Sequence, residues 1–279
     1  MQQISREVND VAVPAVGDAA EVEIRPISHW STNDKVFELV RPFLDNGALV
    51  ADIGAGEGFF SSKMGKYLAS VGKDPSASLS ACDLFPEYFR YRAITCDPVL
   101  MDGRLPYADS TFDVACSLEV VEHLEDQFLF TRELLRILKP GGTAIISTPN
   151  VLNINSRLRT LHSGFAVLFD PLSLSSKDPV HTSGHINPVS YYYLAYMLAR
   201  AGFDKVSVEY DRLKSSARGG LTLAGPFVAI GNALFRRRFR QRSPVVEAEN
   251  KAILDSMNSY KMLCARSVIA IARKASIPA

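Results

Sequence analysis

Apolar runs of strand length alternate along this chain with stretches in which apolar residues recur at every third or fourth position. The runs predict buried strands, and the amphipathic stretches predict helices that cover them. Strands that are joined through helices form a parallel sheet, because a parallel connection has to cross over the sheet. The predicted strands are Leu49–Ile53, Leu79–Leu84, one within Ala93–Met101, Phe112–Ser117, Thr143–Ser147, Lys205–Tyr210 and Ser267–Ala272.

One predicted helix, Ser31–Leu44, precedes the first strand, and the others lie between strands, at Phe59–Leu68, Phe128–Leu138 and Val189–Ala201. We expect Ser31 or Thr32 to cap the first of them. Lys139–Gly142 predicts a turn in front of the fifth strand. Two segments interrupt the alternation, an irregular one at 149–188 and another at 211–258. The pattern therefore predicts an α/β domain over residues 31–279, with insertions after strands five and six, behind a flexible lead-in of residues 1–30.

Composition narrows the class of protein. The 279 residues are 47% hydrophobic and 22% charged, and the net charge is +1, so we do not expect a nucleic-acid binder. The N-terminus lacks the basic segment followed by an apolar one that marks a signal peptide. The four cysteines form no Cys-x-x-Cys pair, which predicts reduced core thiols. Together these features favour a cytoplasmic protein.

A glycine-rich turn follows the first strand. Gly54, Gly56 and Gly58 stand at alternate positions, so a ligand can lie against the main chain without a Cβ in the way. The helix behind the turn directs its free N–H groups at such a ligand. Asp52 adds a carboxylate beside it, which suits a ligand with an amino group. Phe59 stands where the dinucleotide fingerprint has its third glycine, which argues against NAD or FAD.

The spacing Asp-x-Gly-x-Gly-x-Gly over residues 52–58 resembles motif I of the class I S-adenosylmethionine-dependent methyltransferases. This resemblance implies a Rossmann-like, seven-stranded, mostly parallel sheet with helices on both faces. It also implies that S-adenosylmethionine is the cofactor. Asp83 ends the second strand, where an acidic side chain can bind both ribose hydroxyls.

Two further segments carry the same resemblance. The run from Asp102 to Asp113 resembles the family signature in which the first aspartate accepts the adenine amino group. Asp97 competes for that role, because the third strand is indistinct. Lys139–Gly142 matches the family's turn before strand five. We add Ser117, at the end of the fourth strand, to the cofactor-binding set.

The segment after the fourth strand holds the candidate catalytic groups. Positions i, i+3 and i+4 share one face of a helix, so Glu119, Glu122 and His123 would converge there and could hold Mg²⁺ or Mn²⁺. The segment resembles the Glu-x-x-Glu-His of the ubiquinone-biosynthesis O-methyltransferases and of small-RNA 2′-O-methyltransferases, where it binds a divalent metal. In the RNA enzymes a second histidine completes the site. His185 lies in the matching place, and His181 is the alternative.

The same residues also allow a site without metal. His123 or His185 would then act as a general base or contact the substrate. We predict O-methylation of a small molecule, lipid precursor or sugar. The alternatives are a metal-independent C- or N-methyltransferase, and a cofactor-binding pseudoenzyme that scaffolds a biosynthetic complex.

The second insertion contains the apolar run Leu221–Phe235, followed by five arginines within 236–242. Such a segment is too short to span a bilayer but can lie in a membrane interface, here peripherally at the inner membrane. The favoured alternative is a helix packed on the domain or in a dimer interface, with solvated arginines. The sequence leaves the oligomeric state open.

Overall fold

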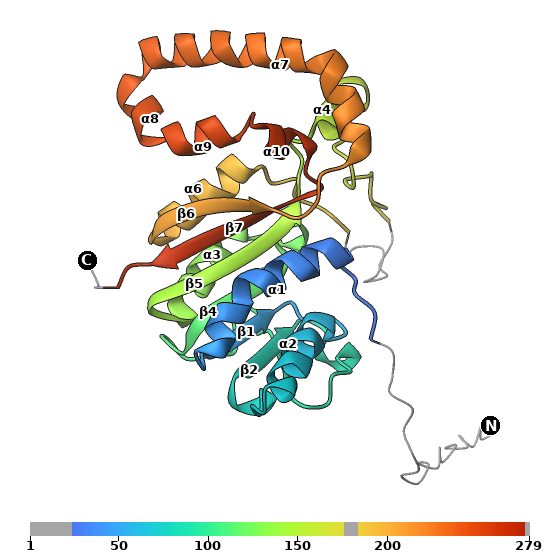
Figure 1. The fold of residues 1–279 in the computed structure, drawn as a ribbon, viewed down its shortest axis with the longest axis vertical. Coiled ribbons are helices and arrows are strands. Elements are labelled where there is room, and N and C mark those ends of the chain that lie inside the picture. Colours follow the sequence, from blue (N-terminus) through green and yellow to red (C-terminus); the bar gives the residue numbers. More distant parts are fainter. Residues whose placement is uncertain (1–23, 176–183, 277–279) are drawn as a thin grey trace, which may run out of the picture.

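The computed structural model describes residues 24–175 and 184–276, and it contains the predicted α/β domain (Figure 1). A seven-stranded sheet has the order β3-β2-β1-β4-β5-β7-β6, in which β7 is antiparallel to both of its neighbours. The neighbouring pairs among the first five strands are parallel. The strands are β1 (Val50–Ile53), β2 (Leu79–Asp83), β3 (Cys96–Pro98), β4 (Phe112–Leu118), β5 (Leu138–Pro149), β6 (Phe203–Tyr210) and β7 (Ser267–Lys274).

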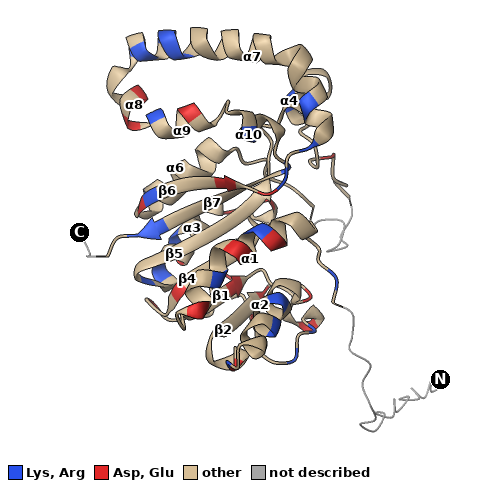
Figure 2. Ribbon diagram, viewed as in Figure 1, with Lys and Arg blue, Asp and Glu red and all other residues tan. Residues whose placement is uncertain are grey.

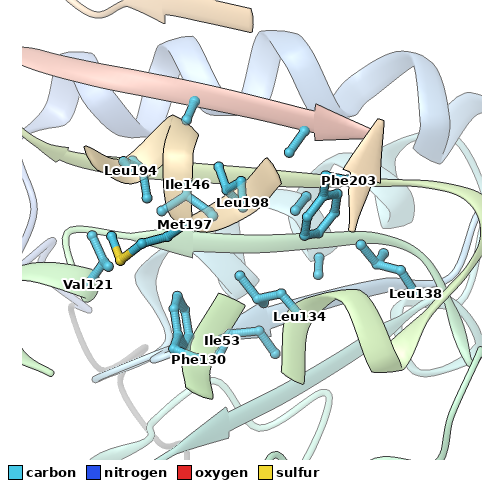
Figure 3. Close-up of a cluster of buried hydrophobic side chains, with 14 of the residues drawn as sticks. Ile53, Val121, Phe130, Leu134, Leu138, Ile146, Leu194, Met197, Leu198 and Phe203 are labelled. Carbon is cyan, nitrogen blue, oxygen red and sulfur yellow. The ribbon is translucent and has the colours of Figure 1, made fainter. Parts of the chain in front are cut away.

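Helices cover both faces of this sheet, as predicted. On one face, α1 (Trp30–Asp45) and α2 (Phe59–Ser70) bury an apolar cluster against β1, β4 and β5. On the other face, α3 (Gln127–Ile137) and α6 (Tyr191–Ala201) cover the larger cluster. Figure 3 shows Leu134 and Leu198 of these helices around Ile146 of β5. The sheet thus has two dry faces, which leaves the ends of its strands for ligands.

Three local predictions were wrong. The cap of α1 is His29, whose side chain accepts from Ser31 N, because the Ser31 and Thr32 hydroxyls donate instead to Asp211. The residues that we expected to form a turn, Lys139–Gly142, belong to β5, where the pairing with β4 shifts register. The first insertion is not irregular throughout, because Asn153 caps a helix, α4 (Ile154–Ser163).

The second insertion is helical and stands apart from the sheet. A long helix, α7 (Ser215–Arg242), turns back through α8 (Pro244–Glu249) and α9 (Lys251–Ser256), and α10 (Tyr260–Cys264) leads into β7 (Figure 1). Figure 2 shows lysine and arginine at the end of α7 near α8, where acidic residues face it. We call the segment 215–256 the α7 arm.

Short 3-10 turns complete the described chain, at η1 (Pro75–Ala77), η2 (Pro86–Tyr88) and η3 (Val121–His123). All four cysteines are free thiols, and only Cys96 is not fully buried, as predicted. Of the helices in the described ranges, none is both long and apolar enough to cross a membrane. The expected flexible lead-in falls largely on residues 1–23, which lie outside the described residues.

Candidate active site

The glycine turn after β1 has the backbone that its sequence predicts. Gly54, Gly56 and Gly58 all have positive φ, at 76°, 54° and 88°. A Cβ at Gly54 would lie 2.4 Å from Val120 Cγ2, and one at Gly58 would lie 2.7 Å from the ring of Phe89. At Gly54 and Gly58, a side chain is therefore excluded both by the backbone conformation and by the neighbouring atoms. The turn leads directly into α2, whose first N–H groups face the same end of the sheet.

Two predicted carboxylates flank this turn. Asp52 is buried and accepts a hydrogen bond of 2.7 Å from Ser61 Oγ. Burial raises its pKa to about 6, so part of its population is protonated near neutral pH. Asp83 lies at the end of β2, and its carboxylate accepts from Gly56 N at 2.8 Å and from Phe85 N at 2.9 Å. Asp83 thus holds the turn open as well as facing the ligand space.

A cavity of about 1020 Å³ opens at this end of the sheet, and we call it the glycine-turn cavity. The turn, Asp52, Asp83 and Asp102 all line it. Asp102 is exposed, and its pKa is lowered by hydrogen bonds from Arg104, first from the backbone N–H at 3.1 Å and then from Nε at 2.7 Å. Among the described residues, the competing Asp97 does not line the cavity, and neither does Ser117. The Ser117 Oγ is buried with no described hydrogen-bond partner.

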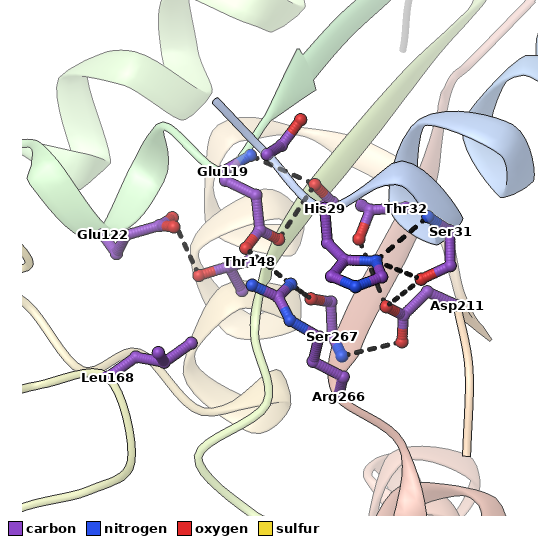
Figure 4. A network of polar contacts seen from close by, with 12 residues as sticks. His29, Ser31, Thr32, Glu119, Glu122, Thr148, Leu168, Asp211, Arg266 and Ser267 are labelled. Atoms are coloured by element: carbon purple, nitrogen blue, oxygen red, sulfur yellow. Dashed lines mark hydrogen bonds and ion pairs between the residues drawn. The ribbon is translucent and has the colours of Figure 1, made fainter. Parts of the chain in front are cut away.

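The segment after β4 differs from its prediction. Glu119 has a φ of 56°, and residues 121–123 form the single 3-10 turn η3 rather than the start of an α-helix. Glu119 therefore leaves the face that Glu122 and His123 share. Its carboxylate lies in the network of Figure 4, 3.4 Å from Arg266 Nη1 and 3.3 Å from Ser147 Oγ. Paired in this way, Glu119 does not join the other candidate ligands.

The other three candidate ligands do converge. One ligand atom each from Glu122, His123 and His185 lies within 4.8 Å of the others, and the two imidazole rings are 4.7 Å apart. Both histidines line the glycine-turn cavity. His185 reaches this place because Ile186 N and Asn187 N donate to the carbonyl of Glu122. The alternative histidine, His181, lies outside the described residues.

Hydrogen bonds orient both rings. His123 Nδ1 lies 3.1 Å from the carbonyl oxygen of Gly184, and His185 Nδ1 lies 2.7 Å from that of Leu168. A carbonyl oxygen only accepts, so Nδ1 of each ring is the donor, and in the neutral form of the ring Nε2 carries the lone pair. His185 Nε2 lies 4.0 Å from Glu122 Oε1. A neutral imidazole with its proton on Nδ1 can bind a metal or accept a proton through Nε2.

Known proteins resemble this chain in both sequence and fold. The protein-family model of a methyltransferase domain matches residues 51–146 of this sequence. The match includes the glycine turn, Asp83, Asp102 and the Glu122–His123 turn. A ubiquinone biosynthesis O-methyltransferase of Ruegeria pomeroyi is 32% identical over 179 residues, which are 55% of this chain and 68% of that relative. The chain belongs to the S-adenosylmethionine-dependent methyltransferases.

Other relatives agree over shorter stretches. A probable S-adenosylmethionine-dependent methyltransferase of Mycolicibacterium smegmatis is 33% identical over 37% of this chain and 32% of its own length. The chain spans less than half of the length of the first curated relatives that it matches. The crystal structure of an S-adenosylmethionine-dependent methyltransferase from Archaeoglobus fulgidus matches the fold at a TM-score of 0.50 and 15% identity, covering 87% of this chain and 94% of that one.

Two parts of the glycine-turn cavity were not predicted. Residues 25–28, which we assigned to the lead-in, line the glycine-turn cavity, and so does Arg266 in front of β7. The sequence held no local signal for either, because neither lies in a motif. Tertiary contacts bring them there: Asp211 accepts from the first turn of α1 and from Ser267 N, which places the start of α1 beside Arg266 (Figure 4).

Electrostatics distinguish the two glutamates of the methyltransferase. Burial and the neighbouring Glu119 raise the pKa of Glu122 to about 8. Its Oε2 accepts from Thr148 Oγ1 at 3.0 Å, whereas its Oε1 is buried without a hydrogen-bond partner among the described residues. Burial also raises the pKa of Glu119, but the Arg266 guanidinium opposes that shift. Among the described residues, Glu122 therefore has no lysine or arginine within ion-pair distance, and His185 is its one ion-pair neighbour.

Proposed function

We propose that this methyltransferase transfers the methyl group of S-adenosylmethionine to a hydroxyl oxygen of a small molecule, lipid precursor or sugar. The observation that carries the proposal is the cluster of Glu122, His123 and His185 in the same cavity as the glycine turn. The name of the Ruegeria pomeroyi relative, a ubiquinone biosynthesis O-methyltransferase, supports an oxygen acceptor.

In this proposal the cofactor lies along Gly54–Gly58. The backbone N–H groups at the start of α2 face its carboxylate end, Asp83 accepts from the ribose hydroxyls and Asp102 accepts from the adenine amino group. Methyl transfer is an in-line displacement at the sulfonium carbon. The enzyme then has to align the two reactants and remove the proton of the acceptor.

The cluster suits a divalent cation. One carboxylate and two imidazoles, each with a lone pair on Nε2, form a suitable donor set, and the buried Glu122 Oε1 lacks any other described partner. A bound cation would supply Lewis-acid polarisation of the acceptor oxygen. Glu122, whose pKa of about 8 keeps it largely protonated at neutral pH, would have to lose its proton to hold a cation. His123 and His185 keep their orientation through the carbonyls of Gly184 and Leu168.

One observation also favours a version without metal. Burial lowers the pKa of His185, and the neighbouring His123 lowers it further, so the ring is neutral near pH 7. A neutral imidazole with its lone pair on Nε2 can accept the acceptor's proton directly. In this version His185 or His123 is the general base, and Glu122 matters less.

Chelation separates the two versions. With a metal, EDTA abolishes release of S-adenosylhomocysteine in the presence of a hydroxyl acceptor, and Mg²⁺, Mn²⁺ or Zn²⁺ restores it. His185→Ala should then lose both activity and metal content in elemental analysis. His162→Ala is the matched control, because His162 lies exposed on α4. Full activity in EDTA, with no metal bound, would discard the cation and leave a histidine base.

The same assay tests whether the protein is an enzyme of this acceptor class at all. Calorimetric titration with S-adenosylmethionine establishes cofactor binding independently of turnover. Binding without turnover on phenolic, sugar or lipid hydroxyls would overturn the proposed O-methylation. It would favour the pseudoenzyme scaffold or an amine or carbon acceptor.

A further inference from the structure

A second cavity, of about 590 Å³, lies under the α7 arm, and we call it the α7 cavity. Its walls come from α7, from the start of α6, from α4 and from the loop around α9 (Figure 1). It shares no lining residue with the glycine-turn cavity among the residues that the structure describes. Its volume falls within the range of about 300–1,000 Å³ that is usual for small-molecule sites.

Most of this wall is apolar. Aromatic rings line it from two sides, with Tyr192 and Tyr193 on α6 and Phe227, Phe235 and Phe239 on α7. Phe235 and Phe239 stack on each other with ring centroids 5.6 Å apart. Gly231 of α7 also faces the cavity, and a Cβ there would meet nothing within 4 Å. The gap beside this glycine leaves room for a chain that runs along α7.

One side of the wall carries a cation. Arg157 of α4 donates to three neutral acceptors, which are the carbonyl oxygens of Leu152 and Met257 and Asn258 Oδ1. No carboxylate of the described residues pairs with it, and burial lowers its pKa. Arg157 is half-buried, and a guanidinium that is partly withdrawn from water gains from pairing with an anion. Arg157 therefore places a positive charge at the cavity wall, and no carboxylate within 24–175 and 184–276 is its counter-ion.

Polar groups continue from this cation towards α7. Asn258 accepts from Arg157 Nη1 at 2.8 Å, and its own amide donates to Asn232 Oδ1 of α7 at 2.9 Å. These three residues form a polar strip, and the aromatic rings form the apolar remainder of the same wall. The cavity is thus amphipathic, with one positively charged end.

We propose that the α7 cavity binds a single-chain amphiphile with an anionic head group. The head, a carboxylate or a phosphate, pairs with Arg157, and the apolar chain lies along Gly231 between the rings of α6 and α7. This site is separate from the methyl-transfer site and does not depend on the identity of the methyl acceptor.

Binding of a fluorescent fatty acid to the full chain tests the proposal. The probe is cis-parinaric acid, whose emission rises in an apolar environment. We expect saturable binding of the probe to the wild type. Its Kd for Gly231→Leu should be at least about tenfold higher, because the leucine side chain occupies part of the cavity. Gly219→Leu is the matched control, since Gly219 lies on the same helix, meets nothing within 4 Å and does not line the cavity. Unchanged affinity for S-adenosylmethionine shows that both variants are folded.

Competition then tests the charge. Palmitate and lysophosphatidate should displace the probe, whereas hexadecanol, which has the same chain without the charge, should displace it poorly. The more effective of the two anions identifies the source of the head group. Arg157→Gln should remove the preference for the anions over the alcohol. The proposal is overturned by the absence of saturable probe binding, by full binding to Gly231→Leu, or by equal displacement with hexadecanol and palmitate in the wild type.

Discussion

At the scale of single residues, backbone conformation at three glycines decides whether a ligand can approach the end of β1. Gly56 has a φ of 54° and donates its N–H to Asp83. Its ideal Cβ would lie 3.0 Å from Ile27 Cδ1, in the lead-in that closes over the turn. A branched residue there is strained and also blocks the approach to the main chain.

We therefore expect Gly56→Val to abolish calorimetric binding of S-adenosylmethionine while the chain remains folded. Gly72→Val is the control, because Gly72 has a similar φ of 74°, an open surrounding and no place in the glycine-turn cavity. It should bind the cofactor like the wild type. Retention of wild-type affinity by a folded Gly56→Val protein would refute the role that we give to this turn.

The buried Glu122 predicts a pH dependence of stability. Its pKa is about 8 in the folded chain against the ordinary 4.5. Between these values the folded chain holds a proton that the unfolded chain has released, so this group's contribution to stability falls as the pH rises through that window. Gln mimics the protonated acid. The Tm of Glu122→Gln should therefore exceed that of the wild type by a margin that grows from about pH 5 to about pH 9.

This comparison is made in EDTA, so that no cation stabilises the carboxylate. Glu87→Gln, at an exposed position in η2, is the control and should follow the wild type at every pH. A constant difference between Glu122→Gln and the wild type over this range would contradict the raised pKa.

At the scale of elements, the α7 arm separates the arginines that we had treated as one cluster. Arg236 Nη2 lies 2.6 Å from Glu247 Oε1, and its Nη1 lies 2.8 Å from Asp255 Oδ1. Arg240 also pairs with Glu247. These contacts hold α7 to α8 and α9, so Arg236 is not available to a membrane. Arg237 and Arg238 are exposed, and neither has a carboxylate partner within the described part of the chain.

An apolar stripe precedes these exposed arginines. Its members, four or seven residues apart on one helix face, are Leu223, Ile230 and Leu234, and all of them are more than half exposed. Contact of the stripe with acyl chains, and of the arginines with anionic lipid, would place α7 in a membrane interface.

We expect the protein to co-sediment with vesicles that contain phosphatidylserine, and to be released as the salt concentration rises. Replacing both Arg237 and Arg238 with Glu should abolish sedimentation, whereas Arg200→Glu on α6 should not. If the wild type stays in the supernatant at low salt, the stripe belongs to an interface between copies of the chain instead.

At the scale of the whole molecule, the glycine-turn cavity and the α7 arm lie at separate places. The cavity is lined mainly by the segments that follow β1, β2, β3 and β4, while α7–α9 contact α4, α6 and α10. A ligand that binds in the glycine-turn cavity should therefore change the amide hydrogen exchange of the α7 arm little.

Saturation with S-adenosylmethionine tests this arrangement. At a hundred times its Kd the cofactor stabilises the folded chain by about 2.7 kcal/mol, which should raise the Tm by several degrees. Amide hydrogen exchange should slow in residues 50–60 and remain unchanged in residues 221–242. Equal protection of both segments would mean that the α7 arm and the cofactor site are coupled.

The sequence alone determined the sheet, the glycine turn and the family. These depend on short-range patterns: alternating apolar runs specify buried strands, and positive φ at alternate positions requires glycine. The last strand was also readable, because Ser267–Ala272 contains a continuous apolar run.

Tertiary structure alone decided which candidate residues meet. Glu119 and Glu122 are three positions apart, yet positive φ at Glu119 turns its carboxylate to Arg266 and away from the histidines. His185 joins His123 across 62 positions of sequence through backbone hydrogen bonds to Glu122, which no local pattern encodes. The pKa values follow from the same cause, since burial and long-range neighbours set them. Local periodicity fixes elements, whereas a site is made by contacts between elements, and those exist only once the chain is packed.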